Sequence, residues 1–216
     1  MTLLAVMLVM ALFAVALLAV APSIQQEVQR ENELDTIQRG EDVARAIQEY
    51  VTAYNGTKLP ESMDDLLEGV PQGTKKRQIM RRSSAVDPLS EDGKWRLIKA
   101  DPKELAKFAK RVQDYNGGLL PSNPSRLLDR YSIILVNSVN IDSDTDPTEP
   151  DEEISTETDN TPFIGVASQS KARSVLTYYG IENHSKWIFT PLFRGTSSSP
   201  TGRRQNAASE TVVDDQ

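Results

Sequence analysis

Residues 3–21 read LLAVMLVMALFAVALLAVA, and this stretch decides the architecture of the chain. It holds 19 consecutive residues without a charged or hydrogen-bonding side chain. At 1.5 Å per helical residue, that length nearly matches a hydrocarbon core of about 30 Å. The stretch therefore predicts a membrane-spanning segment, and we assign residues 1–24 to the transmembrane part of a longer N-terminal helix.

A cleaved secretory signal is the alternative for this stretch, because Ala19-Val20-Ala21 places small residues at the cleavage spacing. Three features favour a retained anchor. No basic residue precedes the apolar run, the run exceeds the usual h-region of about 7–15 residues, and Pro22 would follow the cut.

Beyond Pro22 the chain becomes polar but keeps a helical periodicity. Apolar residues recur at mostly three- and four-residue steps, at Ile24, Val28, Leu34, Ile37, Ala44, Ile47, Val51 and Tyr54. Acid-before-base pairs at i,i+4, Asp35 with Arg39 and Glu41 with Arg45, indicate a solvated opposite face. We expect the helix to continue over residues 25–54, with its apolar stripe packed on a soluble domain rather than in a lone coiled coil.

Residues 55–192 are expected to form that domain. A helix is predicted from Asp101-Pro102 to Gly117-Gly118, with an apolar face of Leu105, Phe108, Ala109, Val112 and Tyr115. Buried strands are predicted at 131–136, 163–167, 175–179 and 187–189. One antiparallel sheet of three to five short strands, packed on the long helix, gives the class α+β. Residues 193–216 are rich in Ser, Thr, Gly and charge, and predict a disordered tail.

Composition excludes several functional classes. The 216-residue chain has a net charge of −7 and no cysteine, so it lacks a dominant basic surface for nucleic acid and any thiolate chemistry. Its one basic cluster, which we interpret as a solvated face, consists of Lys75, Lys76, Arg77, Arg81 and Arg82.

Catalytic motifs are also missing from the sequence. The single histidine, His184, lies in a polar turn, where we expect it at the surface. No neighbouring acid or serine has a catalytic spacing, and no G-x-S-x-G, phosphate loop or H-E-x-x-H occurs. The sequence therefore predicts a protein that is not an enzyme and needs no cofactor.

An acidic segment at residues 140–162 carries nine carboxylates and predicts a solvated linker. A calcium loop is the alternative interpretation, because Asp142, Asp144, Asp146 and Glu153 occupy four of its ligand positions. Pro147 stands where that loop needs the sharp turn of glycine.

Aligned from residue 1, several positions resemble the N-terminal signal and helix of type IV pilins and of the pseudopilins of type II secretion systems. They are Thr2-Leu3-Leu4, Val6-Met7, Ala11 and Pro22. Residues 50–67, YVTAYNGTKLPESMDDLL, resemble the region where the long helix of the major pseudopilin leads into a short second helix, and Ser62 with Asp65 forms a capping-box pattern there. Residues 86–88 and 93–98 resemble a strand entry of the same family.

The resemblance implies a structural subunit of an envelope-spanning pseudopilus that serves protein export. Its implied place is the bacterial inner membrane, crossed once, with the C-terminal domain in the periplasm. Implied partners are other pseudopilin subunits, a secretion ATPase, a platform membrane protein and a prepilin peptidase, which cuts a leader and methylates the new N-terminus. The resemblance also implies calcium binding, because the major pseudopilin binds calcium.

Within the resemblance, Thr2, Leu3, Ala5 and Pro22 are the candidate assembly residues. The family carries a glutamate at the fifth position, where it pairs with a neighbour's N-terminal amine, and this chain has Ala5. That departure is typical of a subunit at the filament tip. Two other functions stay open: a minor type IV pilin, and a signal-anchored periplasmic binding module.

Overall fold

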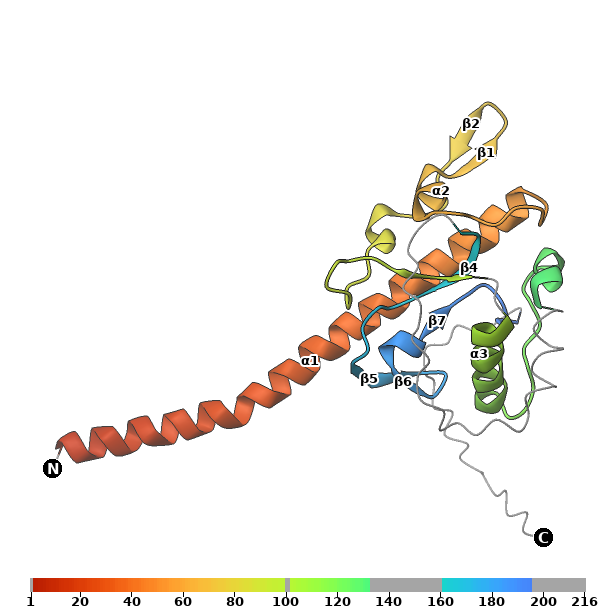
Figure 1. Cartoon of the computed structure of the whole chain (residues 1–216). Helices are drawn as coiled ribbons and strands as arrows, with labels where there is room; N and C mark the ends of the chain where they lie inside the picture. Colours follow the sequence, from red (N-terminus) through yellow and green to blue (C-terminus); the bar gives the residue numbers. More distant parts are fainter. Residues whose placement is uncertain (1, 100–101, 133–160, 196–216) are drawn as a thin grey trace, which may run out of the picture.

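The computed structural model describes residues 2–99, 102–132 and 161–195, without the side chains of residues 2–4, 14–24 and 102–103. Its dominant element is α1 (Thr2–Ala53), a 52-residue helix that runs unbroken through position 22. The C-terminal part of α1 lies against a small domain, and the N-terminal part projects from it (Figure 1). Asn55 and Gly56, with φ of 51° and 73°, end the helix as the sequence predicts.

The domain contains short elements in the following order. They are α2 (Met63–Glu68), β1 (Val70–Gln72), β2 (Lys75–Arg77), η1 (Arg82–Ala85), β3 (Arg96–Lys99), α3 (Pro102–Tyr115), η2 (Arg126–Leu128), β4 (Phe163–Ala167), β5 (Arg173–Tyr178), β6 (Ile181–Asn183), η3 (His184–Lys186) and β7 (Ile188–Phe189). This mixture of helices and small antiparallel sheets confirms the class α+β.

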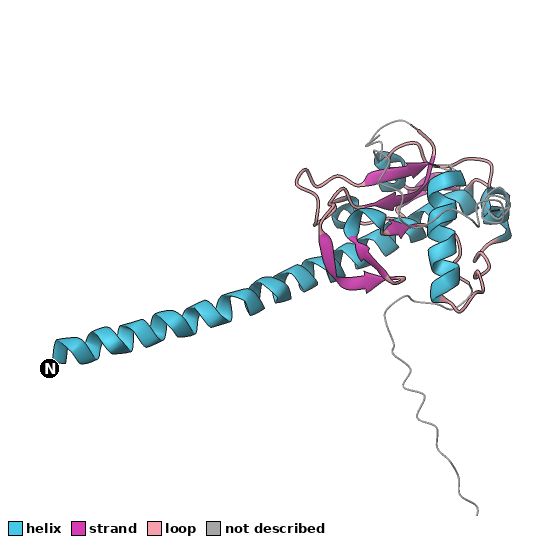
Figure 2. Ribbon diagram, turned by 60° about the horizontal axis from the view of Figure 1, so that its bottom comes forward, coloured by secondary structure: helices cyan, strands magenta, loops and turns pink. Residues whose placement is uncertain are grey.

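The strands form three separate sheets rather than the single sheet expected from the sequence. The central sheet has the order β3-β4-β7, with Leu97 opposite Val166 and Val166 opposite Phe189. The hairpins β1–β2 and β5–β6 are two-stranded and stand apart from it. Figure 2 shows that all strands gather around the C-terminal part of α1, so the projecting part has no strand beside it.

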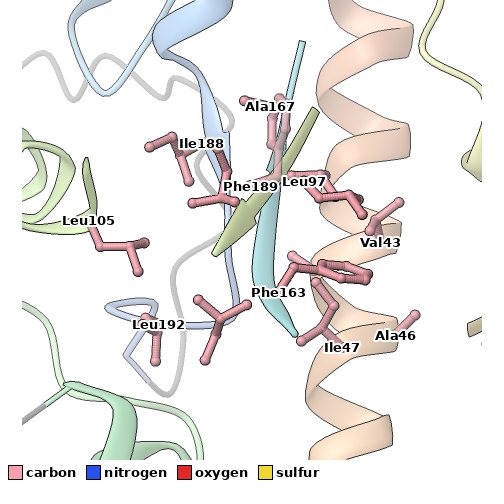
Figure 3. Packing of buried hydrophobic residues seen from close by; sticks show 14 of the residues in the cluster. Val43, Ala46, Ile47, Leu97, Leu105, Phe163, Ala167, Ile188, Phe189 and Leu192 are labelled. Carbon is pink, nitrogen blue, oxygen red and sulfur yellow. The ribbon is translucent and has the colours of Figure 1, made fainter. Parts of the chain in front are cut away.

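The core lies between α1 and the central sheet. Val43, Ala46 and Ile47 of α1 face Phe163 of β4 and Phe189 of β7 (Figure 3). Gly40 permits this approach, because a Cβ built there would lie 2.4 Å from ring atoms of Phe189. The apolar stripe is buried at Ala44, Ile47 and Val51, while Val28 and Leu34 are about half exposed, so the buried part of the stripe begins near Ile37.

Several expectations for single elements are confirmed. Ser62 caps α2 through a capping box with Asp65, whose side chain accepts from the Ser62 backbone N–H. Helix α3 begins at Pro102 and buries Leu105, Phe108, Ala109 and Val112. Asp101, its expected cap, lies outside the described residues.

Other expectations are wrong. Tyr115 is exposed and meets the edge of Tyr179 instead of completing the buried face of α3. Of the strand predicted at 131–136, residues 131 and 132 are helical, and the Ser132 hydroxyl donates to the Asp129 carbonyl at 3.0 Å. Residues 133–136 lie outside the described part. Phe193 is buried and donates its N–H to Asn123, so the packed domain extends into the residues assigned to the tail.

Candidate functional site: an exposed apolar helix and a buried polar clamp

The projecting part of α1 exposes a continuous apolar surface. Among residues 5–13, whose side chains the structure describes, the large ones are all exposed, from 49% at Val9 to 70% at Met10; they comprise Val6, Met7, Leu8, Val9, Met10, Leu12 and Phe13. Exposure on every side of a helix differs from the one-sided stripe of a helix that packs on its own domain. Contiguous apolar surface of this kind is typical of segments that are covered by lipid or by other protein.

The candidate assembly residues lie on this part of α1. Ala5 is exposed and, with Val6, Val9, Met10 and Phe13, lines a shallow apolar hollow. Thr2, Leu3 and Pro22 are helical, but their side chains lie outside the described ones. The predicted span at residues 3–21 is described only in part, and within that part no helix is both long and apolar enough to cross a membrane.

The calcium candidates Asp142, Asp144, Asp146 and Glu153 lie outside the described residues. Among the residues that the structure does describe, no group of three or more His, Asp or Glu side chains could hold a metal ion.

Glu33 of α1 is the centre of a buried polar network. Its carboxylate is fully buried and accepts the backbone N–H groups of Val175 and Leu176, at 2.9 and 2.7 Å. Gln29, one turn earlier on α1, donates to it at 2.9 Å. Burial raises the pKa of Glu33, but the hydrogen bonds from Leu176, Val175, His184 and Gln29 outweigh that effect and lower it below the ordinary value.

This carboxylate holds β5–β6 on α1. Glu33 accepts the N–H groups of Val175 and Leu176, which lie in the irregular part of β5 between the paired residues Arg173 and Tyr178. The hairpin is thus attached to α1 through a side chain rather than through a β-ladder.

His184 completes the network and corrects its predicted position at the surface. It is 2% exposed, and its Nε2 lies 2.9 Å from Glu33. Its Nδ1 lies 3.3 Å from the Ser170 hydroxyl. Nε2 faces the carboxylate and Nδ1 faces the hydroxyl, so both ring nitrogens of this buried side chain have a polar partner. We refer to Glu33, His184 and Ser170 as the polar clamp.

A second polar network, which is partly buried, lies two turns further along α1. Glu41 accepts from the Tyr178 hydroxyl at 2.7 Å and forms a salt bridge with Arg194. Burial and, next, the Glu41 charge raise the pKa of Tyr178 well above its usual range, so this phenol stays a donor. Glu41 was expected to pair with Arg45, which instead bonds Asp42, whereas the predicted pair of Asp35 and Arg39 is present at 2.7 Å.

Both networks perform the same task, since each fixes C-terminal segments of the domain to α1. Sequence reasoning missed them because Glu33 and His184 are separated by 151 positions. One signal was present. Gln29 and Glu33 precede Ile37 at four-residue steps, so polar groups stand where the apolar stripe should continue.

No family model matches the chain, and neither a curated protein nor a solved structure is significantly similar to it.

Proposed function

We propose that this chain is a pseudopilin-like subunit of a type II secretion system, anchored in the bacterial inner membrane with its domain in the periplasm. One observation carries the proposal. A single 52-residue helix exposes apolar side chains all round at residues 5–13 and buries one face in the domain at its C-terminal part. Such a helix can occupy lipid at one end and present a folded domain at the other.

Assembly into a filament is the function that this arrangement supports best. The exposed apolar face at Ala5, Val6, Val9, Met10 and Phe13 can pack against a parallel helix, with Ala5 as the small residue at which the two backbones approach. The partners in this proposal are further subunits, a prepilin peptidase, a secretion ATPase and a platform membrane protein. The subunit itself supplies structure, and the chemistry belongs to these partners.

The chain contains no cysteine, so crosslinking of single-cysteine variants tests the proposal directly. The full chain carrying Leu8→Cys or Leu12→Cys is expressed in membranes and oxidised. A different filament subunit, co-expressed with it, carries a matching cysteine in its membrane helix, and we expect covalent heterodimers, because the proposed filament brings the apolar helices of neighbouring subunits together. Lys110→Cys, on the exposed side of α3, is the matched control and should stay monomeric. A chain that washes from the membrane in alkaline carbonate, or that crosslinks no better at Leu8 than at Lys110, contradicts the proposal.

The position within the filament follows from Ala5. A subunit without a carboxylate at this position cannot repeat the pairing of carboxylate and amine along a shaft, which favours a tip. Ala5→Glu, combined with Leu8→Cys, should then increase crosslinks between copies. Abundant self-crosslinks already present in the chain with native Ala5 would overturn the tip position while leaving the filament intact.

A further inference from the structure

The hairpin β1–β2 and the segment that follows it carry a concentration of positive charge. Residues 70–86 contain five cations and no acidic residue. Between Arg77 and Arg81 the chain spans at most about 14 Å, so the cations of β2 and those beside η1 share one neighbourhood. All five are exposed, and we call them the basic hairpin: Lys75, Lys76, Arg77, Arg81 and Arg82.

Two of these cations are engaged within the domain and three are not. Lys76 bonds Glu68 of α2 at 2.6 Å, and Arg77 bonds Glu49 of α1 at 2.9 Å, and both pairs fix the base of the hairpin. Within the described ranges, the other three cations form no ion pair: they are Lys75, Arg81 and Arg82. Figure 1 shows the hairpin projecting from the domain near the C-terminal end of α1, where a partner can reach it.

The segment around η1 that carries the two arginines is held firmly on α1. Arg39 of α1 donates to the carbonyls of Ser83 and Val86, at 3.0 and 3.2 Å. The Ser84 hydroxyl donates to Asp42, also of α1, at 3.2 Å. Because this backbone is already ordered, binding an anion here costs less conformational entropy than ordering a flexible loop would.

Strand β2 also has an open edge. The turn of two residues makes Gln72 and Lys75 a hydrogen-bonded pair, and such pairs alternate along a hairpin, so Pro71 and Lys76 exchange no ladder bond. The N–H and C=O of Lys76 therefore point away from β1, and no other backbone group of the described ranges bonds to them. On the outer edge of β1, Pro71 has no N–H to offer. A further strand can thus add to β2 and not to β1.

The charges select which kind of strand this edge accepts. Lysine side chains on an edge strand discourage pairing with neutral or basic strands. Opposite charges on paired strands attract, so an acidic strand gains energy where other strands lose it. A phosphate backbone or an anionic lipid surface would meet the cations but would leave the Lys76 N–H and C=O without strand partners. An extended acidic peptide is the ligand chemistry that uses both the charges and the edge.

We propose that the basic hairpin is a docking site for an acidic segment of a different protein, which adds to the outer edge of β2 as an antiparallel strand. The backbone of that segment pairs with Lys76, and its carboxylates face the three unpaired cations. Strand addition gives the contact its geometry, and the charges give it selectivity. The binding itself does not rest on the proposed filament, whereas the choice of a different protein follows from the tip position at Ala5.

A synthetic peptide tests the site on the full chain in detergent micelles. The probe is a fluorescein-labelled heptapeptide in which glutamate alternates with valine, and its anisotropy reports binding. We expect saturable binding that weakens several-fold between 0.05 and 0.5 M salt, as about a threefold shorter screening length requires. Absence of saturable binding at the lower salt concentration overturns the proposal. Neither outcome affects the crosslinks at Leu8→Cys, so the docking site and the filament are tested separately.

Two matched charge reversals locate the site on the chain. The test variant reverses the three unpaired cations and keeps both ion pairs at the hairpin base: Lys75→Glu, Arg81→Glu and Arg82→Glu. The control variant reverses three exposed cations of α3: Lys107→Glu, Lys110→Glu and Arg111→Glu. We expect the test variant to lose binding and the control variant, which has the same net charge, to keep it. Equal losses in the two variants would mean unspecific attraction to the whole domain, which overturns the proposal.

A second pair of variants separates strand addition from attraction by charge alone. Lys76→Ala and Lys76→Pro both remove the side-chain charge, but only proline also removes the outward N–H, at a position that makes no ladder bond to β1. We expect binding several-fold weaker for Lys76→Pro than for Lys76→Ala.

Modified probes repeat this comparison without changing the chain. N-methylation of every peptide N–H keeps the carboxylates and should abolish most of the binding, and glutamine in place of glutamate should abolish it as well. If the N-methylated peptide, or an oligothymidine of equal charge, binds as tightly as the probe, the surface is a general site for polyanions. That result overturns the proposal.

Discussion

Single residues decide how tightly the domain is fixed to α1, and Glu33 is the clearest case. A buried carboxylate is costly unless it is hydrogen-bonded, and here the two backbone N–H groups and the His184 ring compensate for the loss of water. The periodicity of the helix marks position 33 as facing the domain, but it does not reveal the partners. Those come from β5 and η3, whose places depend on the whole fold.

Replacing Glu33 with Gln should destabilise the domain by about 2–3 kcal/mol at pH 7, because bonds to a charged acceptor are weakened and an amide N–H is placed against donors. The folded-state pKa of Glu33 is lowered, so its contribution to stability is complete above the ordinary value of 4.5 and is lost as the pH falls through the lower folded value. Urea unfolding of both proteins at pH 7 and pH 3 measures this. A stability difference that is equal at the two pH values contradicts the assignment.

Gly40→Ala tests the close packing of α1 against the Phe189 ring, which is an apolar contact, unlike the network around Glu33. Alanine favours helix by about 1 kcal/mol over glycine, yet the added Cβ would meet the ring of Phe189 at 2.4 Å. We expect a net loss of about 1–3 kcal/mol from overpacking. Gln38→Ala, exposed on the same helix, is the control and should be nearly neutral. Phe189→Leu should cost less in the Gly40→Ala background than alone, and an additive result would show that the two positions do not interact.

At the level of elements, the sequence predicted the helices and strands that carry a strong local pattern of residues and missed those that carry a weak one. Strand β4 has the predicted bounds because its five residues are all buried, and α3 begins at a proline, as predicted. Hairpin β1–β2 was missed because Lys75, Lys76 and Arg77 carry no alternation of polar and apolar residues. The division into three sheets was not predictable either, because it depends on contacts between segments far apart in the sequence, such as the one between Glu33 and β5.

The cap of α2 offers a test at this scale. Ser62→Ala removes the side chain that accepts from the Asp65 N–H, and we expect about 1 kcal/mol of destabilisation. Ser83→Ala, an exposed serine in η1, is the matched control. If thermal unfolding shows that Ser62→Ala lowers the melting temperature no more than Ser83→Ala does, the capping box contributes nothing to stability.

For the molecule as a whole, the sequence predicted the division of α1 into an apolar part and a packed part. The exposed apolar helix was therefore predictable, since it needs only local composition. The polar clamp was not, because it joins α1 to residues more than a hundred positions away.

A fragment that begins at Gln25 should be soluble and should unfold cooperatively, because the core is formed by residues that follow position 36. Circular dichroism with thermal unfolding measures this. Aggregation, or a melt without a cooperative transition, would show that the apolar part of α1 is needed for the domain to fold.

Deleting residues 141–160 from that fragment should leave the melting temperature nearly unchanged, because a charged linker contributes few buried contacts. The residues tied to Gly56 and Pro60 stay in place. The melt is repeated with millimolar calcium. If calcium stabilises the parent fragment and not the deletion, the segment is a metal site instead of a linker.

The order in which the core is assembled has a consequence for synthesis. Helix α1 is made first, but β4, β5 and β7, which cover its apolar face, lie in the last third of the described chain. At about 5–20 residues per second, that face waits roughly 7–27 s on the ribosome before β7 has been made. During this interval the apolar face of the newly made helix is exposed and can associate with other unfolded chains. A nascent subunit of this kind should therefore depend on a chaperone that holds the face of α1 until translation reaches residue 189.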